Sequence, residues 1–272
     1  MRRAPATAKL NLTLVVGPKR DDGRHEVATV LQRLDLADRI AVEPSERLRV
    51  EGFPDDTLVR AALETLASAA AVEPRWLARI WKRIPVAAGL GGGSSDAATA
   101  LRLANETLPE PLAPAPLEEL AAGLGADVPF FLASGPQLGE GTGADLSPLE
   151  LPQDYWVVLV VPTGARKTST ADVYAAFDHR AGADGYGKRL AELAEALANV
   201  RRPRDLAALP PNDLASSPVA EELRDLGAFR ADVTGAGPAV YGLFHHREQA
   251  AAAERRLRLR GRTWLSVPTW YG

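Results

Sequence analysis

A glycine-rich segment at residues 85–96 carries the most readable chemistry in the sequence. It reads Pro-Val-Ala-Ala-Gly-Leu-Gly-Gly-Gly-Ser-Ser-Asp, with four glycines in the five positions 89–93. Glycine loses more conformational freedom on folding than other residues, so such a cluster indicates a backbone that approaches another group closely. A helix is expected to follow, and the free N–H groups and dipole at a helix start attract anions. We therefore predict that this segment binds the phosphates of ATP.

The predicted ATP-binding residues share this one segment and are Pro85, Val86, Ala87, Ala88, Gly89, Leu90, Gly91, Gly92, Gly93, Ser94 and Ser95. Two common nucleotide-binding motifs do not fit it. A Walker A loop has a lysine after its last glycine, where this chain has Ser94. A Rossmann fingerprint begins directly after a strand, whereas Pro85 intervenes here and the glycine spacing differs.

A lysine and an aspartate, far apart in the sequence, are the candidate catalytic residues. Phosphoryl transfer to an alcohol needs a carboxylate to accept or orient the hydroxyl proton. It also needs positive charge to offset the charge that gathers on the phosphates. Asp127 follows a helix-ending glycine and precedes an apolar run, and Lys9 could hold its carboxylate in place. The fold would have to bring the two residues together.

Lys9 belongs to a predicted strand at residues 9–15, where polar and apolar residues alternate with period two. One face would carry leucines and the other polar groups, namely Leu10, Leu12 and Leu14 against Lys9, Asn11 and Thr13. An ordinary lysine in such a place is an exposed residue of an edge strand. The catalytic interpretation therefore depends on Asp127.

The pattern along the chain predicts a mixed α+β protein of two domains, residues 1–153 and 154–272. In the first part, strands are expected at 9–15, 27–36, 39–42 and 77–83, and helices at 58–71, 95–108 and 117–124. In the second part, we expect a buried strand at 156–161, a polar loop at 167–170, helices at 188–200, 218–226 and 248–259, and two strands around a glycine turn within 229–244.

Composition excludes several classes of protein. The chain has 272 residues, 46% hydrophobic and 25% charged, as in ordinary globular proteins. A net charge of -3 with mixed signs gives no support to nucleic-acid binding. There are no cysteines to ligate a metal, and His245 and His246 would point to opposite faces of a strand. With no signal-peptide or membrane-span pattern, we expect a cytoplasmic protein without a membrane partner, either a monomer or a homodimer.

Three separated segments together resemble the GHMP kinases, a superfamily named for galactokinase, homoserine, mevalonate and phosphomevalonate kinases. They are residues 8–12 (Ala-Lys-Leu-Asn-Leu), the glycine-rich segment, and residues 124–131 (Leu-Gly-Ala-Asp-Val-Pro-Phe-Phe). Residues 21–26, 212–214 and 234–239 resemble the same family. The Gly-Leu-Gly-Gly-Gly-Ser-Ser-Asp form of the loop is similar to one branch, which phosphorylates the 2-hydroxyl of a cytidyl-diphosphate derivative of methylerythritol in non-mevalonate isoprenoid synthesis.

This resemblance implies a fold and a set of roles. The N-terminal domain would be like the second domain of ribosomal protein S5, and the C-terminal domain would be ferredoxin-like. Asp127 would be the catalytic base and Lys9 its charge partner, while Asn11 and His25 would bind the cytidyl substrate. The glycine-rich turn at 235–238 would close over the phosphates. Mg²⁺ is expected to arrive with ATP, held mainly by phosphate oxygens and water, so no protein metal ligand is assigned.

Two positions depart from the family pattern. Arg24 stands where relatives usually have an aromatic residue that can stack on the cytosine, although a planar guanidinium can also stack on a base. Ala236 stands where relatives more often have serine. Two alternatives therefore stay open: a GHMP kinase for another small alcohol, of the homoserine or mevalonate type, and a non-catalytic nucleotide-binding module.

Overall fold

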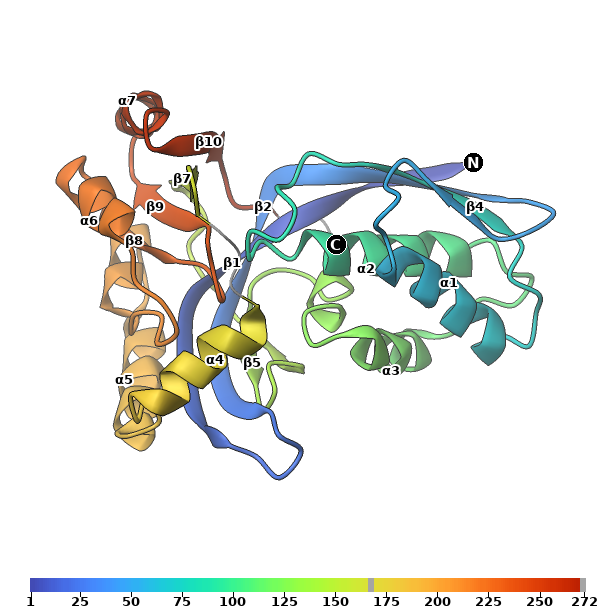
Figure 1. Ribbon diagram of the computed structural model, residues 1–272, viewed down its shortest axis with the longest axis horizontal. Coiled ribbons are helices and arrows are strands. Elements are labelled where there is room, and N and C mark those ends of the chain that lie inside the picture. The colour runs from blue at the N-terminus through green and yellow to red at the C-terminus, as the bar shows by residue number, and fades with distance from the viewer. Residues whose placement is uncertain (166–168, 270–272) are drawn as a thin grey trace.

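Two long antiparallel strands, β1 (Arg2–Lys19) and β2 (His25–Pro44), run through most of the molecule and connect its two halves (Figure 1). The computed structural model describes residues 1–165 and 169–269. The other elements of the first half are β3 (Arg49–Glu51), α1 (Leu58–Ala69), β4 (Trp76–Trp81), α2 (Gly92–Asn105), α3 (Pro114–Leu124), a 3₁₀ turn at Pro129–Phe131, β5 (Gln137–Glu140) and β6 (Asp145–Pro148).

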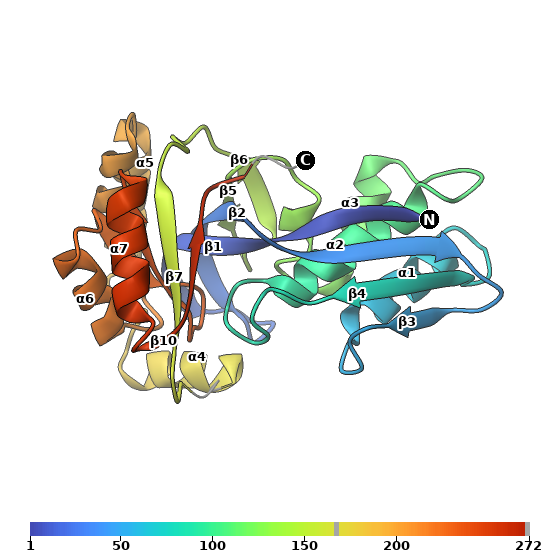
Figure 2. The ribbon, with the colours of Figure 1, turned by 90° about the horizontal axis from the view of Figure 1, so that it is seen from above.

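The first sheet has the strand order β3-β4-β2-β5-β6, with β1 also paired to β2. Helices α1 and α2 cover one face of this sheet, and α3 packs against these two helices (Figure 2). Their packing follows from the sequence of α2, whose alanines, buried on several sides, let the helix lie close to its neighbours. The core between them holds Ile40, Ile80, Leu63, Leu66 and Leu101, each at most 1% exposed.

The second half contains β7 (Trp156–Pro162), α4 (Thr170–His179), α5 (Tyr186–Asn199), a 3₁₀ turn at Pro203–Ala208, α6 (Pro218–Asp225), β8 (Arg230–Val233), β9 (Val240–Phe244), α7 (Arg247–Leu257) and β10 (Gly261–Ser266). Its four antiparallel strands have the order β10-β7-β9-β8. Along the chain, β7 is followed by helices, then β8 and β9, then α7 and β10. In the sheet, β7 lies between β10 and β9. This arrangement is a ferredoxin-like unit. The predicted α+β class and ferredoxin-like C-terminal part are confirmed.

Strand β7 shows how the second sheet is packed on both faces. Val157 and Leu159 face the cluster that contains residues of β1 and α5, whereas Val158 and Val160 face the cluster under α6 and α7. This is the period-two alternation of a strand buried on both faces. Strands β1 and β2 contribute to the core of the first half and also to the cluster that underlies the second sheet. The domain boundary near residue 153 stays a prediction.

Several predicted elements have different bounds. The strands expected at 27–36 and 39–42 are one strand, β2, which continues through the buried Asp38. Helix α2 begins at Gly92, three residues before the predicted start, because Gly91 adopts the left-handed conformation that ends the loop. Register shifts in β1 interrupt the predicted alternation, and Leu14 packs in a different cluster from Leu10 and Leu12.

Other elements were not predicted at all. Strand β10 and the short β5–β6 hairpin have no counterpart in the sequence-based prediction. The polar loop expected at 167–170 is wrong in its described part, because Ser169 caps α4 and Thr170 is its first residue. Lys167 and Thr168 lie outside the described residues.

Candidate active site

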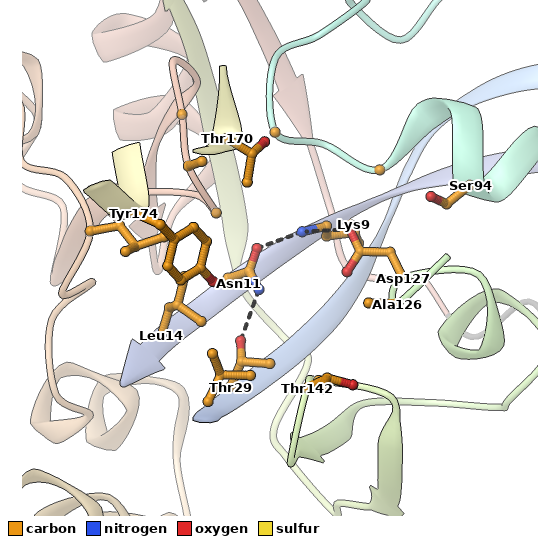
Figure 3. Close-up of a pocket in the computed structure, with 18 residues that line it drawn as sticks. Lys9, Asn11, Leu14, Thr29, Ser94, Ala126, Asp127, Thr142, Thr170 and Tyr174 are labelled. Atoms are coloured by element: carbon orange, nitrogen blue, oxygen red, sulfur yellow. Dashed lines mark hydrogen bonds and ion pairs between the residues drawn. The ribbon is translucent and has the colours of Figure 1, made fainter. Parts of the chain in front are cut away.

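Lys9 and Asp127 lie together at the side of a cavity of about 310 Å³ (Figure 3). The distance from Lys9 Nζ to Asp127 Oδ2 is 3.3 Å. The lysine side chain is 5% exposed and the aspartate side chain 41% exposed, so the cation is buried while the carboxylate faces the cavity. An exposed edge-strand lysine, the ordinary interpretation, is wrong for Lys9. The arrangement leaves the carboxylate accessible to a hydroxyl group in the cavity.

Asn11 holds Lys9 from the same strand. Its Oδ1 accepts a hydrogen bond of 2.6 Å from Lys9 Nζ, and its Nδ2 donates one of 2.8 Å to Thr29 Oγ1. Its backbone N–H donates to Thr234 Oγ1 at 2.9 Å. The polar face of β1 is therefore buried and paired, which restricts the lysine to one orientation. Thr29 carries no sequence signal that could have assigned it to the site, whereas Thr234 begins the 234–239 segment that resembles the family.

The glycine-rich loop is held by two backbone hydrogen bonds from other segments. The backbone N–H of Lys9 donates to the carbonyl of Leu90, and that of Ala239 donates to the carbonyl of Ala88, both at 3.0 Å. Gly89 and Gly91 have φ values of +82° and +70°, a region that favours glycine. A Cβ on Gly91 would lie 2.9 Å from Lys9 Cγ, so the loop backbone passes directly over the lysine.

Most of the predicted ATP-binding segment lines open space. Residues 85–94 line a second cavity of about 320 Å³, together with Phe53, Leu58 and Lys82. Gly89, Gly91 and Ser94 also line the first cavity, so the two spaces meet at the loop. Ser95 differs from the others because it lines neither cavity, and it is buried. The orphan N–H groups at the start of α2 lie between the two cavities and suit an anionic group.

His25 lies in a neighbouring cavity of about 430 Å³, whose lining shares Val27, Thr142 and Tyr174 with the first cavity. Its Nε2 is 2.7 Å from Asp178 Oδ1, and its ring stacks on Tyr174 with 4.8 Å between centroids. Lys19 and Arg24 line the same cavity. An aromatic, partly charged cavity beside the Lys9–Asp127 pair is therefore available for a planar group with an attached phosphate.

Tyr174 is the largest side chain that sequence reasoning missed. Figure 3 shows it on one side of the Lys9–Asp127 pair, with Ser94 on the other. Burial, with the nearby Asp127 carboxylate, raises the pKa of Tyr174 to about 12, so the phenol stays protonated at neutral pH. It comes from α4, a helix whose Ser169–Asp172 capping box was a usable sequence signal.

Arg33 connects the Asp127 turn to the sheet. It lies opposite Lys9 in the β1–β2 register and donates from Nη2 to the carbonyls of Phe130 (2.8 Å) and Ala133. Its guanidinium carbon is 5.4 Å from the centre of the Phe130 ring. Burial lowers the pKa of Arg33 to about 10, which still leaves it charged at pH 7. The arginine thus fixes the segment that follows Asp127.

We expect Arg33→Met to lower kcat about tenfold or more, because the carboxylate loses its fixed position. The same change should reduce the free energy of unfolding by about 2 kcal/mol, since two buried carbonyls lose a charged donor. Steady-state kinetics and chemical denaturation measure both. Arg39→Met, an exposed arginine of the same strand, is the control. A destabilised Arg33→Met protein with unchanged kcat would limit Arg33 to a structural role.

The described residues contain neither a membrane-spanning helix nor a cluster of metal-binding side chains. No helix in residues 1–165 and 169–269 is long and apolar enough to cross a bilayer. In the same ranges, no group of three or more His, Asp or Glu side chains gathers closely enough to hold a metal ion. The Lys9–Asp127 pair and the loop are suited to accepting a proton at Asp127 and to binding an anion at the loop.

The chain matches two family models, described as the GHMP kinases N terminal domain over residues 57–135 and the GHMP kinases C terminal over residues 186–263. It is also 39% identical over 264 residues to the 4-diphosphocytidyl-2-C-methyl-D-erythritol kinase of Anaeromyxobacter sp. (strain Fw109-5). That alignment covers 93% of this chain and 85% of the relative.

Solved structures show the same relationship. The crystal structure of a 4-(cytidine 5'-diphospho)-2C-methyl-D-erythritol kinase superposes with a TM-score of 0.81 at 33% identity, over 100% of both chains. The mevalonate kinase of Methanococcus jannaschii superposes with a TM-score of 0.76 at 13% identity, over 98% of each chain. The second likeness is one of fold alone.

Proposed function

The chain belongs to the GHMP kinase family, and within it we propose that this enzyme phosphorylates the 2-hydroxyl of 4-diphosphocytidyl-2-C-methyl-D-erythritol with ATP. Such a reaction is a step in non-mevalonate isoprenoid precursor synthesis. The observation that carries the proposal is one cavity lined both by the Lys9–Asp127 pair and by Gly89, Gly91 and Ser94. A base and a phosphate-binding loop then face the same space.

In the proposed reaction, the substrate hydroxyl lies against Asp127 while the γ-phosphoryl group of ATP lies at the N-terminus of α2. The hydroxyl oxygen forms the new bond to phosphorus, the bond between the γ-phosphorus and the β–γ bridging oxygen breaks, and ADP leaves. Asp127 accepts the hydroxyl proton and later releases it to water. Lys9 and the loop N–H groups offset the negative charge that develops on the phosphoryl oxygens.

The cytidyl end of the substrate is proposed to occupy the His25 cavity. The ring of Tyr174 offers an aromatic face, and Arg24 offers a planar cation in the place of the usual aromatic residue. Lys19 is the second cation in the lining, suited to the diphosphate. Asn11 would contribute its second amide hydrogen to the substrate, since the first is bonded to Thr29.

ATP is proposed to extend from the first cavity, where its γ-phosphate meets the loop, into the cavity lined by Phe53, Leu58 and Lys82. Mg²⁺ would arrive with the nucleotide and neutralise part of the phosphate charge, coordinated by phosphate oxygens and water. Because both substrates are highly charged small molecules, we propose that the enzyme acts in the cytoplasm. We also propose that it has no nucleic-acid or membrane partner and that it is a monomer or a homodimer.

An ADP-release assay on a panel of alcohols tests the substrate assignment. Purified protein with Mg-ATP is offered the cytidyl-diphosphate substrate, mevalonate or homoserine. Turnover restricted to the cytidyl substrate is the expected result. Turnover on another alcohol alone would contradict the assignment and favour the alternative that Arg24 suggests. Bound ATP with no turnover on any alcohol would favour a non-catalytic nucleotide-binding module.

We expect His25→Ala to raise KM for the cytidyl substrate about tenfold, because a stacked, hydrogen-bonded wall of its cavity is removed. The KM for ATP should not change, since His25 lies outside both cavities at the glycine-rich loop. His179→Ala, an exposed histidine at the end of α4, is the matched control. An unchanged KM for the cytidyl substrate would show that the cytosine ring binds outside the His25 cavity.

A further inference from the structure

Three charged side chains gather beneath the glycine-rich loop: Asp38 on β2, Lys82 directly after β4, and Asp96 in α2. Lys82 Nζ donates to Asp96 Oδ2 at 2.7 Å and also to Asp38 Oδ2. The side chains are almost fully buried, with 0% of Asp38, 2% of Asp96 and 16% of Lys82 exposed. We call these three residues the loop clamp. None of them contacts the Lys9–Asp127 pair by a hydrogen bond or ion pair that the structure records.

The loop clamp holds both ends of the ATP-binding loop at one point. Asp38 Oδ1 accepts the backbone N–H groups of Arg83 and Ile84 (2.8 Å for Ile84), the two residues before the loop begins. Asp96 is the residue directly after Ser95, where the loop has become a helix. Lys82 joins the two carboxylates. Movement of any member would therefore change the span across which the loop presents its N–H groups.

One atom of the loop clamp is not paired. Within residues 1–165 and 169–269, no hydrogen-bond donor reaches the buried Asp96 Oδ1. A buried carboxylate oxygen without a donor is costly, whereas a protonated carboxyl group can itself donate, here to Asp38. Burial, together with the neighbouring Asp38 carboxylate and a hydrogen bond to it, raises the pKa of Asp96 to about 7. Both protonation states are therefore accessible near neutral pH.

The charges around Asp96 favour the neutral state when an anion binds. Among the described residues, the charges that act on Asp96 come from Asp38 and Lys82. On β1, Lys9 is engaged with Asn11 and Asp127, and α1 and α3 meet α2 through apolar side chains. With Asp96 ionised, the loop clamp has two negative charges and one positive. Phosphates at the start of α2 would be repelled by that excess, which disappears when Asp96 is protonated.

We propose that Asp38, Lys82 and Asp96 are positioning residues for the phosphate loop, and that Asp96 takes up a proton when ATP binds. The inference rests on the proposed function only in assigning the ATP phosphates to residues 85–95. It predicts that the protein binds ATP more tightly at low pH, where Asp96 is already neutral. Affinity falls as the pH rises through the value at which the free protein releases this proton.

Asp96→Asn tests the proton, because asparagine reproduces the neutral carboxyl group: it accepts from Lys82 and donates to Asp38. Calorimetry measures Kd for Mg-ATP at pH 6 and pH 8 without any alcohol substrate. If ATP raises the Asp96 pKa by about one unit, the Kd of the wild type should rise between pH 6 and pH 8 by about fivefold more than the Kd of the variant. Titrations in two buffers of different ionisation enthalpy should show proton uptake by the wild type and none by the variant at that site.

Asp96→Ala tests the positioning, since alanine can neither accept from Lys82 nor donate to Asp38. We expect its Kd for ATP to rise severalfold at pH 6 as well as at pH 8. Asp35→Asn, a carboxylate on the same strand as Asp38 that is bonded to Ser266, is the control. Equal pH dependence in wild type and Asp96→Asn would overturn the proton uptake, and wild-type affinity in Asp96→Ala would overturn the positioning. Neither result depends on which alcohol is phosphorylated.

Discussion

Asp127→Asn is expected to lower kcat by about 10²–10⁴-fold, the usual contribution of a positioned general base. Asparagine has nearly the same shape and can still accept a hydrogen bond from Lys9, which lies 3.3 Å from the carboxylate. It cannot take up the proton of the attacking hydroxyl. Binding of ATP should change little, because Asp127 belongs to the turn after α3, and the loop proposed to bind the phosphates is untouched.

Single-turnover kinetics with saturating ATP separate these two effects, and Kd for ATP is measured independently by calorimetry. Glu119→Gln, an exposed carboxylate on α3, is the matched control and should behave like the wild type. An Asp127→Asn enzyme that keeps most of its kcat would remove the general-base role. A large loss of ATP affinity would instead place the carboxylate at the nucleotide.

Gly89→Ala is expected to raise Kd for ATP about tenfold or more, because a left-handed φ costs an L-residue roughly 1–2 kcal/mol and the new methyl group also collides with its surroundings. Gly89 has φ +82°. Its Cβ would lie 2.6 Å from the carbonyl oxygen of Thr234 and 3.0 Å from that of Gly237. The two glycine-rich segments would have to separate, and Thr234 also donates to and accepts from Asn11, so kcat should fall as well.

Gly123→Ala provides the control for this substitution. That glycine lies in α3, and a Cβ there would meet no atom within 4 Å. Alanine at Gly123 should leave ATP affinity unchanged. If Gly89→Ala also binds ATP normally, the close contact between the two glycine-rich segments has no part in nucleotide binding.

The sequence was sufficient to predict which segments meet at the candidate site. Glycine and hydroxyl residues just before a helix indicated an anion site, and phosphoryl transfer chemistry suggested a carboxylate paired with a cation. The structure brings Lys9 and Asp127 together with that loop. The burial of the polar face of β1 could not be predicted from its period-two alternation. This burial depends on contacts that β1 makes with β2 and with the 234–239 turn.

The hardest features to predict were those created by tertiary contacts. Aspartate is uncommon in strands, and the predicted strands stopped on either side of Asp38, whereas Ala37 and Asp38 pair with β1 and keep the strand continuous. Strand β10 lacks an apolar run and forms by pairing with β7. Helix α4 was missed together with Tyr174, which lines two cavities, although the Ser169–Asp172 capping box was a local signal for the start of the helix.

Product analysis by proton-coupled ³¹P NMR tests the central claim most directly, namely that this site transfers phosphate to the 2-hydroxyl of the cytidyl substrate. Carbon 2 of a 2-C-methyl erythritol bears no hydrogen, so a 2-phosphate should give a monoester signal without three-bond splitting, alongside an intact diphosphate and new ADP. The signal should be absent with Asp127→Asn over the same time. A monoester split into a doublet or triplet, or no monoester at all, would contradict the account.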